Sequence, residues 1–236
     1  MWLQDLVRFP AAIRRARRHA HRVPPLPPRP ARPQRRVLLA GDSLALGVGA
    51  RSPRSPFAWQ IATEFPGVAL DNVASVGARA AELAAQLELA PHSRYDAVII
   101  TIGGNDVIRL TRRERLRFGL ERGLAQARRM AELVIAATSA NVGGAPLFPW
   151  PLCTLYDRRS RALRAIMAQA CRAHGAVMVN YVFDKDEDPF GRETGRYYAA
   201  DKVHPSDAAY TACYEMLKRG APLERVLTCA QSAPAR

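Results

Sequence analysis

The sequence predicts an α/β fold, in which a parallel β-sheet is covered by helices on both faces. Segments typical of strands alternate with segments typical of helices along residues 37–236, and this alternation is characteristic of parallel sheets. Hydrophobic residues make up 48% of the 236-residue chain and charged residues 24%, a composition that supports a buried core. Polar motifs directly follow several predicted strands, which is where such sheets bind their ligands.

Three short apolar runs predict the first strands of the sheet. Val37–Ala40 ends at Gly41, a second run lies around Val68–Leu70, and Ala97–Ile102 is rich in β-branched residues, which favour strands. Between the second and third strands, apolar residues over about Ala78–Leu89 recur at helical spacing. This part of the chain therefore predicts a strand–helix–strand unit.

A long amphipathic helix is predicted over residues 114–139. Leu116, Leu120 and Leu124 recur there at intervals of four residues, which places them on one face of a helix. A fourth strand near Ala145–Phe148 then fits the alternation of elements.

Three further elements complete the predicted fold. Arg159–His174 predicts a helix that ends at Gly175, because glycine commonly follows the last helical residue. Ala176–Val182 predicts a fifth strand, and Ser206–Lys218 predicts a closing helix.

Residues 1–36 predict a basic, proline-rich arm that precedes a domain of residues 37–236. The arm holds ten arginines and one acidic residue, Asp5, so +9 of the net charge of +14 belongs to it. Proline fixes φ and lacks an N–H donor, so residues 23–36 are expected to be extended and linker-like. The folded part of the chain is then only mildly basic.

Three roles fit the arm, and the first is a solvated, disordered extension. The second is a short amphipathic helix on an anionic membrane surface, with its apolar side chains inserted, namely Trp2, Leu3, Leu6 and Phe9. Nucleic-acid binding is the least favoured, since the domain offers no aromatic or groove-reading partner.

The N-terminus and the cysteines predict a cytoplasmic protein, peripheral to the membrane where the arm binds it. The apolar residues precede the charges, which is the reverse of a secretory signal, and no stretch reaches the roughly 18–20 apolar residues of a membrane span. Four cysteines match no metal motif or redox pair and are expected to be free thiols: Cys153, Cys171, Cys213 and Cys229.

Ser43 is the candidate nucleophile, because it lies just past the first predicted strand. A serine at this turn can project its hydroxyl over the sheet edge, and the amides of the following helix offer hydrogen-bond donors. The surrounding residues form neither a G-x-S-x-G elbow nor a phosphate-binding loop. Taken alone, Ser43 is better explained as a helix cap.

Gly77 and Asn105 are candidate oxyanion donors in the loops after the second and third strands. Glycine lets a backbone N–H approach a ligand closely, and an asparagine amide can stabilise an oxyanion. Ordinary turns would use the same two residue types.

Asp201 and His204 are the candidate orienting acid and base. They lie three residues apart in one loop, close enough for the carboxylate to bind Nδ1–H and leave Nε2 free to accept a proton. A surface histidine before a helix start, with Pro205 at an early helical position, is the alternative. Together with Ser43, these residues complete a set for acyl transfer.

The order and spacing of these motifs resemble the SGNH-hydrolase, or GDSL esterase/lipase, family over about residues 36–219. The matching blocks are GDSL at 41–44, Gly77 in its loop, GGND at 103–106 and DKVHP at 201–205. The resemblance implies a three-layer α/β/α, flavodoxin-like sandwich with a five-stranded parallel sheet. It also implies Ser43 as nucleophile, His204 as base and Asp201 as its support. The oxyanion hole would comprise the Ser43 and Gly77 amides with the Asn105 side chain, without metal or cofactor.

We therefore predict a serine esterase that cleaves carboxylic esters through an acyl-enzyme intermediate. A short-chain ester, a lysophospholipid, an acyl thioester or an acetylated carbohydrate would suit the same machinery, and so would acyl transfer to an alcohol. A catalytically silent membrane-surface binding module is the alternative from a different class.

Overall fold

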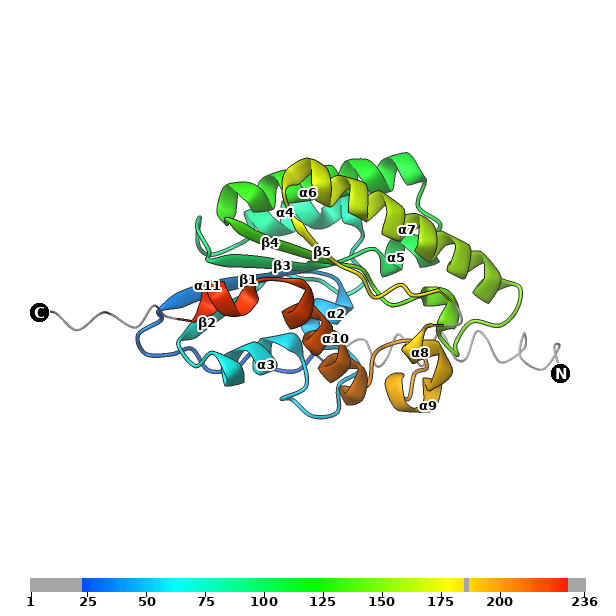
Figure 1. Cartoon of the computed structure of the whole chain (residues 1–236), viewed down its shortest axis with the longest axis horizontal. Helices are drawn as coiled ribbons and strands as arrows, with labels where there is room; N and C mark the ends of the chain where they lie inside the picture. The colour runs from blue at the N-terminus through cyan, green and yellow to red at the C-terminus, as the bar shows by residue number, and fades with distance from the viewer. Residues whose placement is uncertain (1–22, 185–186, 229–236) are drawn as a thin grey trace, which may run out of the picture.

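A computed structural model describes residues 23–184 and 187–228. Its five strands are all parallel and form one sheet in the order β2-β1-β3-β4-β5. Figure 1 shows this sheet between two layers of helices. The predicted three-layer, flavodoxin-like sandwich is thus confirmed. The strands are β1 (Arg35–Gly41), β2 (Val68–Asn72), β3 (Ala97–Thr101), β4 (Leu133–Ala137) and β5 (Val177–Val179).

Successive residues of the central strands face opposite layers of the sandwich. Leu38 and Val98 belong to one hydrophobic cluster, whereas their neighbours Leu39 and Ile99 belong to the other. Side chains alternate across a strand, so a strand covered on both faces must be apolar at nearly every position. This explains the continuous apolar runs in the sequence.

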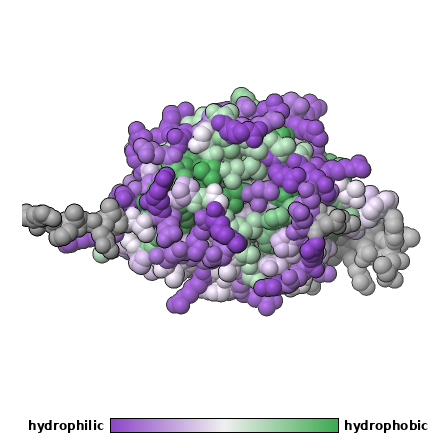
Figure 2. Space-filling model, in the orientation of Figure 1, coloured by the Kyte–Doolittle hydropathy of each residue, from purple (hydrophilic) through white to green (hydrophobic). Residues whose placement is uncertain are grey.

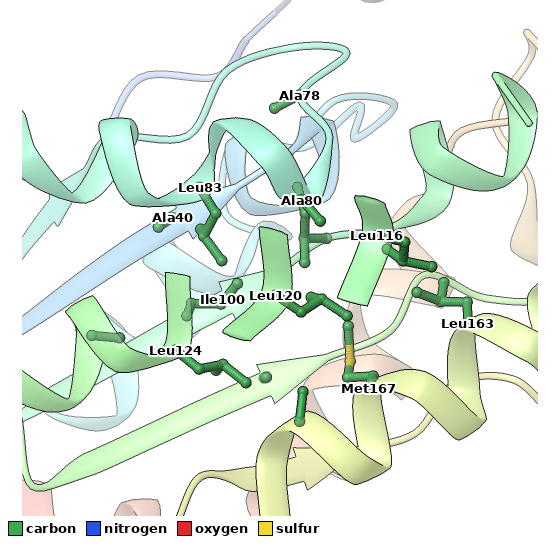
Figure 3. Packing of buried hydrophobic residues seen from close by; sticks show 14 of the residues in the cluster. Ala40, Ala78, Ala80, Leu83, Ile100, Leu116, Leu120, Leu124, Leu163 and Met167 are labelled. Atoms are coloured by element: carbon green, nitrogen blue, oxygen red, sulfur yellow. The ribbon is translucent and has the colours of Figure 1, made fainter. Parts of the chain in front are cut away.

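Two groups of helices cover the sheet. One face packs against η1 (Ala80–Glu82), α4 (Leu83–Glu88), α6 (Arg113–Met130) and α7 (Leu152–His174). The other face packs against α3 (Phe57–Glu64), α10 (Asp207–Gly220) and α11 (Leu223–Leu227). In Figure 3, Leu120 and Leu124 of α6 and Met167 of α7 extend into the first interior, where Ile100 of β3 also lies.

The fourth strand is Leu133–Ala137, so its predicted position at Ala145–Phe148 is wrong. The helix predicted over residues 114–139 ends at Met130, because Ala131 is extended (φ −149°, ψ 150°). All five residues of β4 are buried. A helix that packs on the sheet buries only the residues of its inner face, whereas a strand covered on both sides buries every residue.

The remaining elements agree with the prediction apart from their ends. Helix α7 begins at Leu152 rather than Arg159, and Gly175 ends it with φ 61° as expected. Strand β5 is shorter than the predicted Ala176–Val182. Helix α10 begins directly after Ser206, whose hydroxyl caps it by accepting a hydrogen bond from Ala209 N at 3.3 Å.

Residues 23–34 form no helix or strand but contact the domain. The indole N–H of Trp59 donates to the carbonyl of Pro25 at 2.8 Å, Pro27 is buried, and Arg29 forms an ion pair with Asp71. This part of the proline-rich segment therefore lies on the domain surface. The amphipathic helix predicted near Trp2 falls outside the described residues and stays a prediction, as does the domain boundary at residue 36.

In the view of Figure 2, hydrophilic residues surround the face, while hydrophobic residues are exposed across its middle. Within the described ranges, no helix is both long and apolar enough to cross a membrane. The cysteines placed by the structure are free thiols, as predicted: Cys153, Cys171 and Cys213.

Candidate active site

The candidate residues gather at the carboxyl ends of β1 and β3. After β1 the chain crosses to β2 on one side, and after β2 it crosses to β3 on the other, which makes this edge a topological switch point. Ser43 opens the short helix α2 (Ser43–Leu46), and Asn105 lies in the first turn of α5 (Gly104–Ile108). The sheet order therefore places the two residues at neighbouring strand ends.

Gly41 allows β1 to turn sharply into Ser43. Its φ is +118°, and a Cβ atom there would lie 1.9 Å from the carbonyl oxygen of Thr101. Only glycine tolerates both the backbone angle and the close approach. Asp42 then caps α2, because its Oδ1 accepts a hydrogen bond from Leu44 N at 3.0 Å.

Gln86, a residue that sequence reasoning did not select, ties the loop of Gly77 to β1. Its side chain exchanges two hydrogen bonds with the backbone of Gly41, at 3.0 and 2.9 Å. Its amide also lies 2.9 Å from Ser75 Oγ. Gly77 itself has φ +80°, a left-handed conformation that favours glycine.

Three candidate hydrogen-bond donors at this edge have no acceptor within the described part of the chain. The backbone amides of Ser43 and Gly77 donate to no described residue, and helix geometry leaves the first amide of α2 without an intrahelical acceptor. The side-chain amide of Asn105 lies at the cavity and likewise bonds to no described residue. These groups are available to an oxygen atom of a ligand.

Asp201 and His204 form a buried pair in the loop before α10. Asp201 Oδ2 lies 2.6 Å from His204 Nδ1, while Oδ1 accepts the backbone N–H groups of His204 and Val203 at 3.0 and 3.1 Å. Asp201 is only 2% exposed. Burial on its own raises the pKa of this carboxyl, but the bonds from His204 and Val203 together hold it below the ordinary value. The carboxylate is therefore ionised and fixes the ring of His204.

Ser43, Asn105 and His204 line one cavity of about 120 Å³. Gly77 is not part of its lining, and no hydrogen bond joins Ser43 Oγ to His204 among the described residues. Such bonds are often long in unliganded enzymes and shorten with substrate. The rest of the wall is mainly apolar, with Leu44, Ile108, Val142, Ala145, Phe190 and Val203.

The loop after β4 supplies parts of this wall that sequence reasoning missed. Ser139 and Asn141 both line the cavity, and Ser139 Oγ is buried without a hydrogen-bond partner among the described residues. They could have been found as residues following a strand, had β4 been placed correctly. No three histidine, cysteine or acidic side chains gather to hold a metal ion within residues 23–184 and 187–228.

Asp42 makes the stability of this edge depend on pH. Burial raises the pKa of its carboxyl from 3.8 to about 7, against the lowering effects of the Leu44 amide and His204. The folded state thus binds this proton more tightly than the unfolded state. The resulting stabilisation is complete below pH 3.8 and is lost as the pH rises through about 7.

Asp42→Asn should therefore become increasingly stabilising, relative to wild type, as the pH rises. Asparagine can keep the cap, so the difference in free energy of unfolding should grow by up to about 4 kcal/mol from acid to neutral pH. Urea unfolding of both proteins across this range measures the difference. A constant difference would contradict the prediction.

The fold and this edge of the sheet place the protein among hydrolases with a three-layer α/β/α fold. The model of the GDSL-like lipase/acylhydrolase family matches residues 39–212. The chain belongs to this family, as the sequence motifs predicted, and hydrolysis of carboxylic esters is the family's general reaction. A comparison with curated proteins found no match to the sequence.

Solved structures show the same fold at low sequence identity. Phospholipase A1 from Streptomyces albidoflavus is 18% identical with a TM-score of 0.61, and the match covers 79% of this chain and 99% of that one. An acetylxylan esterase from Geobacillus stearothermophilus is 19% identical with a TM-score of 0.54, covering 86% and 99% of the two chains. At these identities the likeness concerns the fold alone.

Proposed function

We propose that the protein is a serine esterase that hydrolyses carboxylic esters of short acyl chains. Ser43 would act as nucleophile, His204 as general base and then acid, and Asp201 as the group that orients His204. The amides of Ser43 and Gly77 with the side chain of Asn105 would bind the oxyanion.

The observation that carries this proposal is the Asp201–His204 pair, placed at the cavity that Ser43 and Asn105 also line. A 2.6 Å contact to a carboxylate that is 2% exposed fixes the proton on Nδ1 and leaves Nε2 basic. A surface histidine beside a helix start would need no such buried partner. The pair therefore supports catalysis over a merely structural role.

The reaction would proceed in two acyl-transfer steps. Ser43 Oγ forms a bond to the ester carbonyl carbon as its proton passes to His204 Nε2, and the carbonyl oxygen gains the negative charge. The C–O bond to the alcohol then breaks, and His204 returns the proton to the departing oxygen. Water attacks the acyl-Ser43 ester in the same way, releasing the acid and restoring Ser43.

The size and lining of the cavity support a short acyl chain. Its volume is about 120 Å³, somewhat less than the roughly 150 Å³ of an engineered cavity that holds benzene. Acetyl to butyryl groups fit such a space, and apolar walls suit their methyl and methylene groups.

Hydrolysis of 4-nitrophenyl acetate, butyrate and longer esters tests the function directly. We expect kcat/KM to be highest for the short chains, and a fluorophosphonate to label the peptide that contains Ser43. Absence of both turnover and labelling in the folded protein would refute the esterase. It would favour the silent binding module instead.

Asn105→Ala should lower kcat by roughly 10²–10³ without a comparable change in KM. The asparagine amide would contribute mainly when the oxyanion develops, so its loss removes stabilisation of the transition state. Steady-state kinetics on 4-nitrophenyl acetate, with circular dichroism to verify folding, measure this effect. An unchanged kcat would remove Asn105 from the proposed mechanism.

A further inference from the structure

A second cavity adjoins the candidate active site and has a different chemical character. Its volume is about 530 Å³, and it lies between the first turns of α7 and the short helix α8 (Pro189–Arg192). Figure 1 shows α8 beneath the N-terminal part of α7. Asn141 lines both cavities, so this residue stands where the two spaces meet.

The one-turn segment η2 (Val142–Gly144) forms the wall between the two cavities. Val142 lines the candidate active site, whereas Gly143 and Gly144 line the second cavity. The two cavities therefore lie on either side of one helical turn and share Asn141 in their linings.

The second cavity contains a buried carboxylate with unused hydrogen-bonding capacity. Asp188 lines it and is 3% exposed. Its Oδ1 accepts a hydrogen bond from Phe190 N at 3.0 Å, but no side chain in the described ranges donates to Oδ2. The backbone N–H of Gly191 also bonds to this carboxylate. A carboxylate has about four lone-pair sites, so capacity remains for a ligand hydroxyl.

Glycines keep this oxygen open. A Cβ atom on Gly144 would lie 3.3 Å from Asp188 Oδ2 and 3.6 Å from the hydroxyl of Tyr198, and one on Gly191 would lie 3.1 Å from Oδ2. The Tyr198 hydroxyl is itself buried without a partner among the described residues. Tyr198 lines the candidate active site and not the second cavity, so its hydroxyl lies at the boundary between the two spaces.

The charges around the second cavity balance, which favours a neutral ligand over a cation. Asp157, which also lines it, is paired with Arg161 at 3.0 Å and accepts the amide of Asn141 at 2.7 Å. Arg192 is part of the same lining, so its charge offsets that of Asp188. Carboxylate, amide and guanidinium groups together can bind several hydroxyls of one molecule.

We propose that this cavity, centred on Asp188 and bordered by Gly144 and Asn141, binds the polyhydroxyl part of an ester whose acyl group enters the candidate active site. The substrate class would then be short-chain acyl esters of a sugar or of glycerol. This inference rests on the proposed esterase function and specifies its substrate.

Two variants change the second cavity in different ways. Asp188→Asn keeps one side-chain oxygen that can cap the helix but replaces the other carboxylate oxygen, an acceptor, with an NH₂ donor. Gly144→Ala keeps the carboxylate and places a methyl group against it. Glu193→Gln is the matched control, because this exposed carboxylate pairs with Arg196 and does not line the cavity.

The experiment compares a mono-acetylated methyl glucoside, glycerol monoacetate, acetylcholine and 4-nitrophenyl acetate as substrates. We expect both variants to raise KM by about tenfold for the glucoside or the glycerol ester, while the control and the turnover of 4-nitrophenyl acetate stay unchanged. The ester whose KM rises in both variants shows whether the cavity binds a sugar or glycerol. Calorimetry with free methyl glucoside and with glycerol measures binding to the wild type directly, and this measurement does not depend on catalysis.

The outcomes distinguish this inference from the esterase proposal. Turnover of 4-nitrophenyl acetate without binding or turnover of either polyol compound would overturn the inference alone. Equal effects on all four esters would show a structural role, and a selective effect on acetylcholine would show a cation site; both overturn it. Absence of all ester turnover would instead count against the esterase, and calorimetric binding that both variants weaken would still support the cavity assignment.

Discussion

Ser43→Ala should reduce kcat for ester hydrolysis by roughly 10⁶-fold, the largest effect expected of any single substitution. The variant lacks the oxygen that would form the acyl-enzyme, and the remaining groups cannot replace it, since such a set acts as a unit. The Ser43 side chain makes no hydrogen bond to another described residue, and Asp42 supplies the cap of α2. Folding should therefore be unaffected.

The measurement is single-turnover and steady-state hydrolysis of 4-nitrophenyl acetate, together with labelling by a fluorophosphonate. Ser93→Ala is a suitable control, because Ser93 is exposed and precedes β3, at the opposite edge of the sheet from the candidate site. A Ser43→Ala protein that keeps its turnover or its label would exclude Ser43 as the nucleophile.

Most of the sheet could be predicted because burial on both faces leaves a simple signal. Val37–Ala40 and Ala97–Ile102 are apolar at successive positions, and both were placed within two residues of β1 and β3. Leu133–Ala137 carries the same signal, but its apolar residues continue the helical spacing of α6. Periodicity alone cannot separate a short buried strand from the end of a helix; pairing with β3 decides it.

The candidate site could be predicted where its residues lie in compact motifs. Asp201 and His204 are three residues apart, and the structure confirms their contact at 2.6 Å. Gln86 and Asp188 could not be found in this way, because each acts through a partner distant in sequence or through its burial. Gln86 bonds to Gly41 across 45 positions of the chain. Only the folded structure shows such relations.

The same limit explains why the reaction class could be predicted and the substrate could not. Acyl-transfer chemistry needs few groups, and a short motif can carry each of them. Substrate preference depends on the volume and polarity of walls from many segments, such as the loop after β4 and helix α8. The alternatives among ester substrates therefore become distinguishable only with the cavities in view.

Asp201→Asn is expected to lower kcat by about 10⁴-fold while preserving the fold. Asparagine has nearly the same shape as aspartate, and its oxygen can still accept the backbone N–H groups of Val203 and His204, which Oδ1 now accepts at 3.1 and 3.0 Å. Its amide nitrogen would replace the oxygen beside His204 Nδ1. That nitrogen donates, so it favours the tautomer with the proton on Nε2, where the base should be free.

Kinetics on a short ester across pH, with the wild type in parallel, measure this effect. The hydrogen bonds that lower the pKa of Asp201 outweigh the effect of its burial, so the carboxylate stays ionised at neutral pH. The variant should therefore have a lower kcat than the wild type throughout the neutral range. Thermal unfolding should change far less than kcat, because the loop keeps its backbone bonds. A variant with near wild-type kcat would show that the buried Asp201–His204 pair holds the loop together rather than serving catalysis.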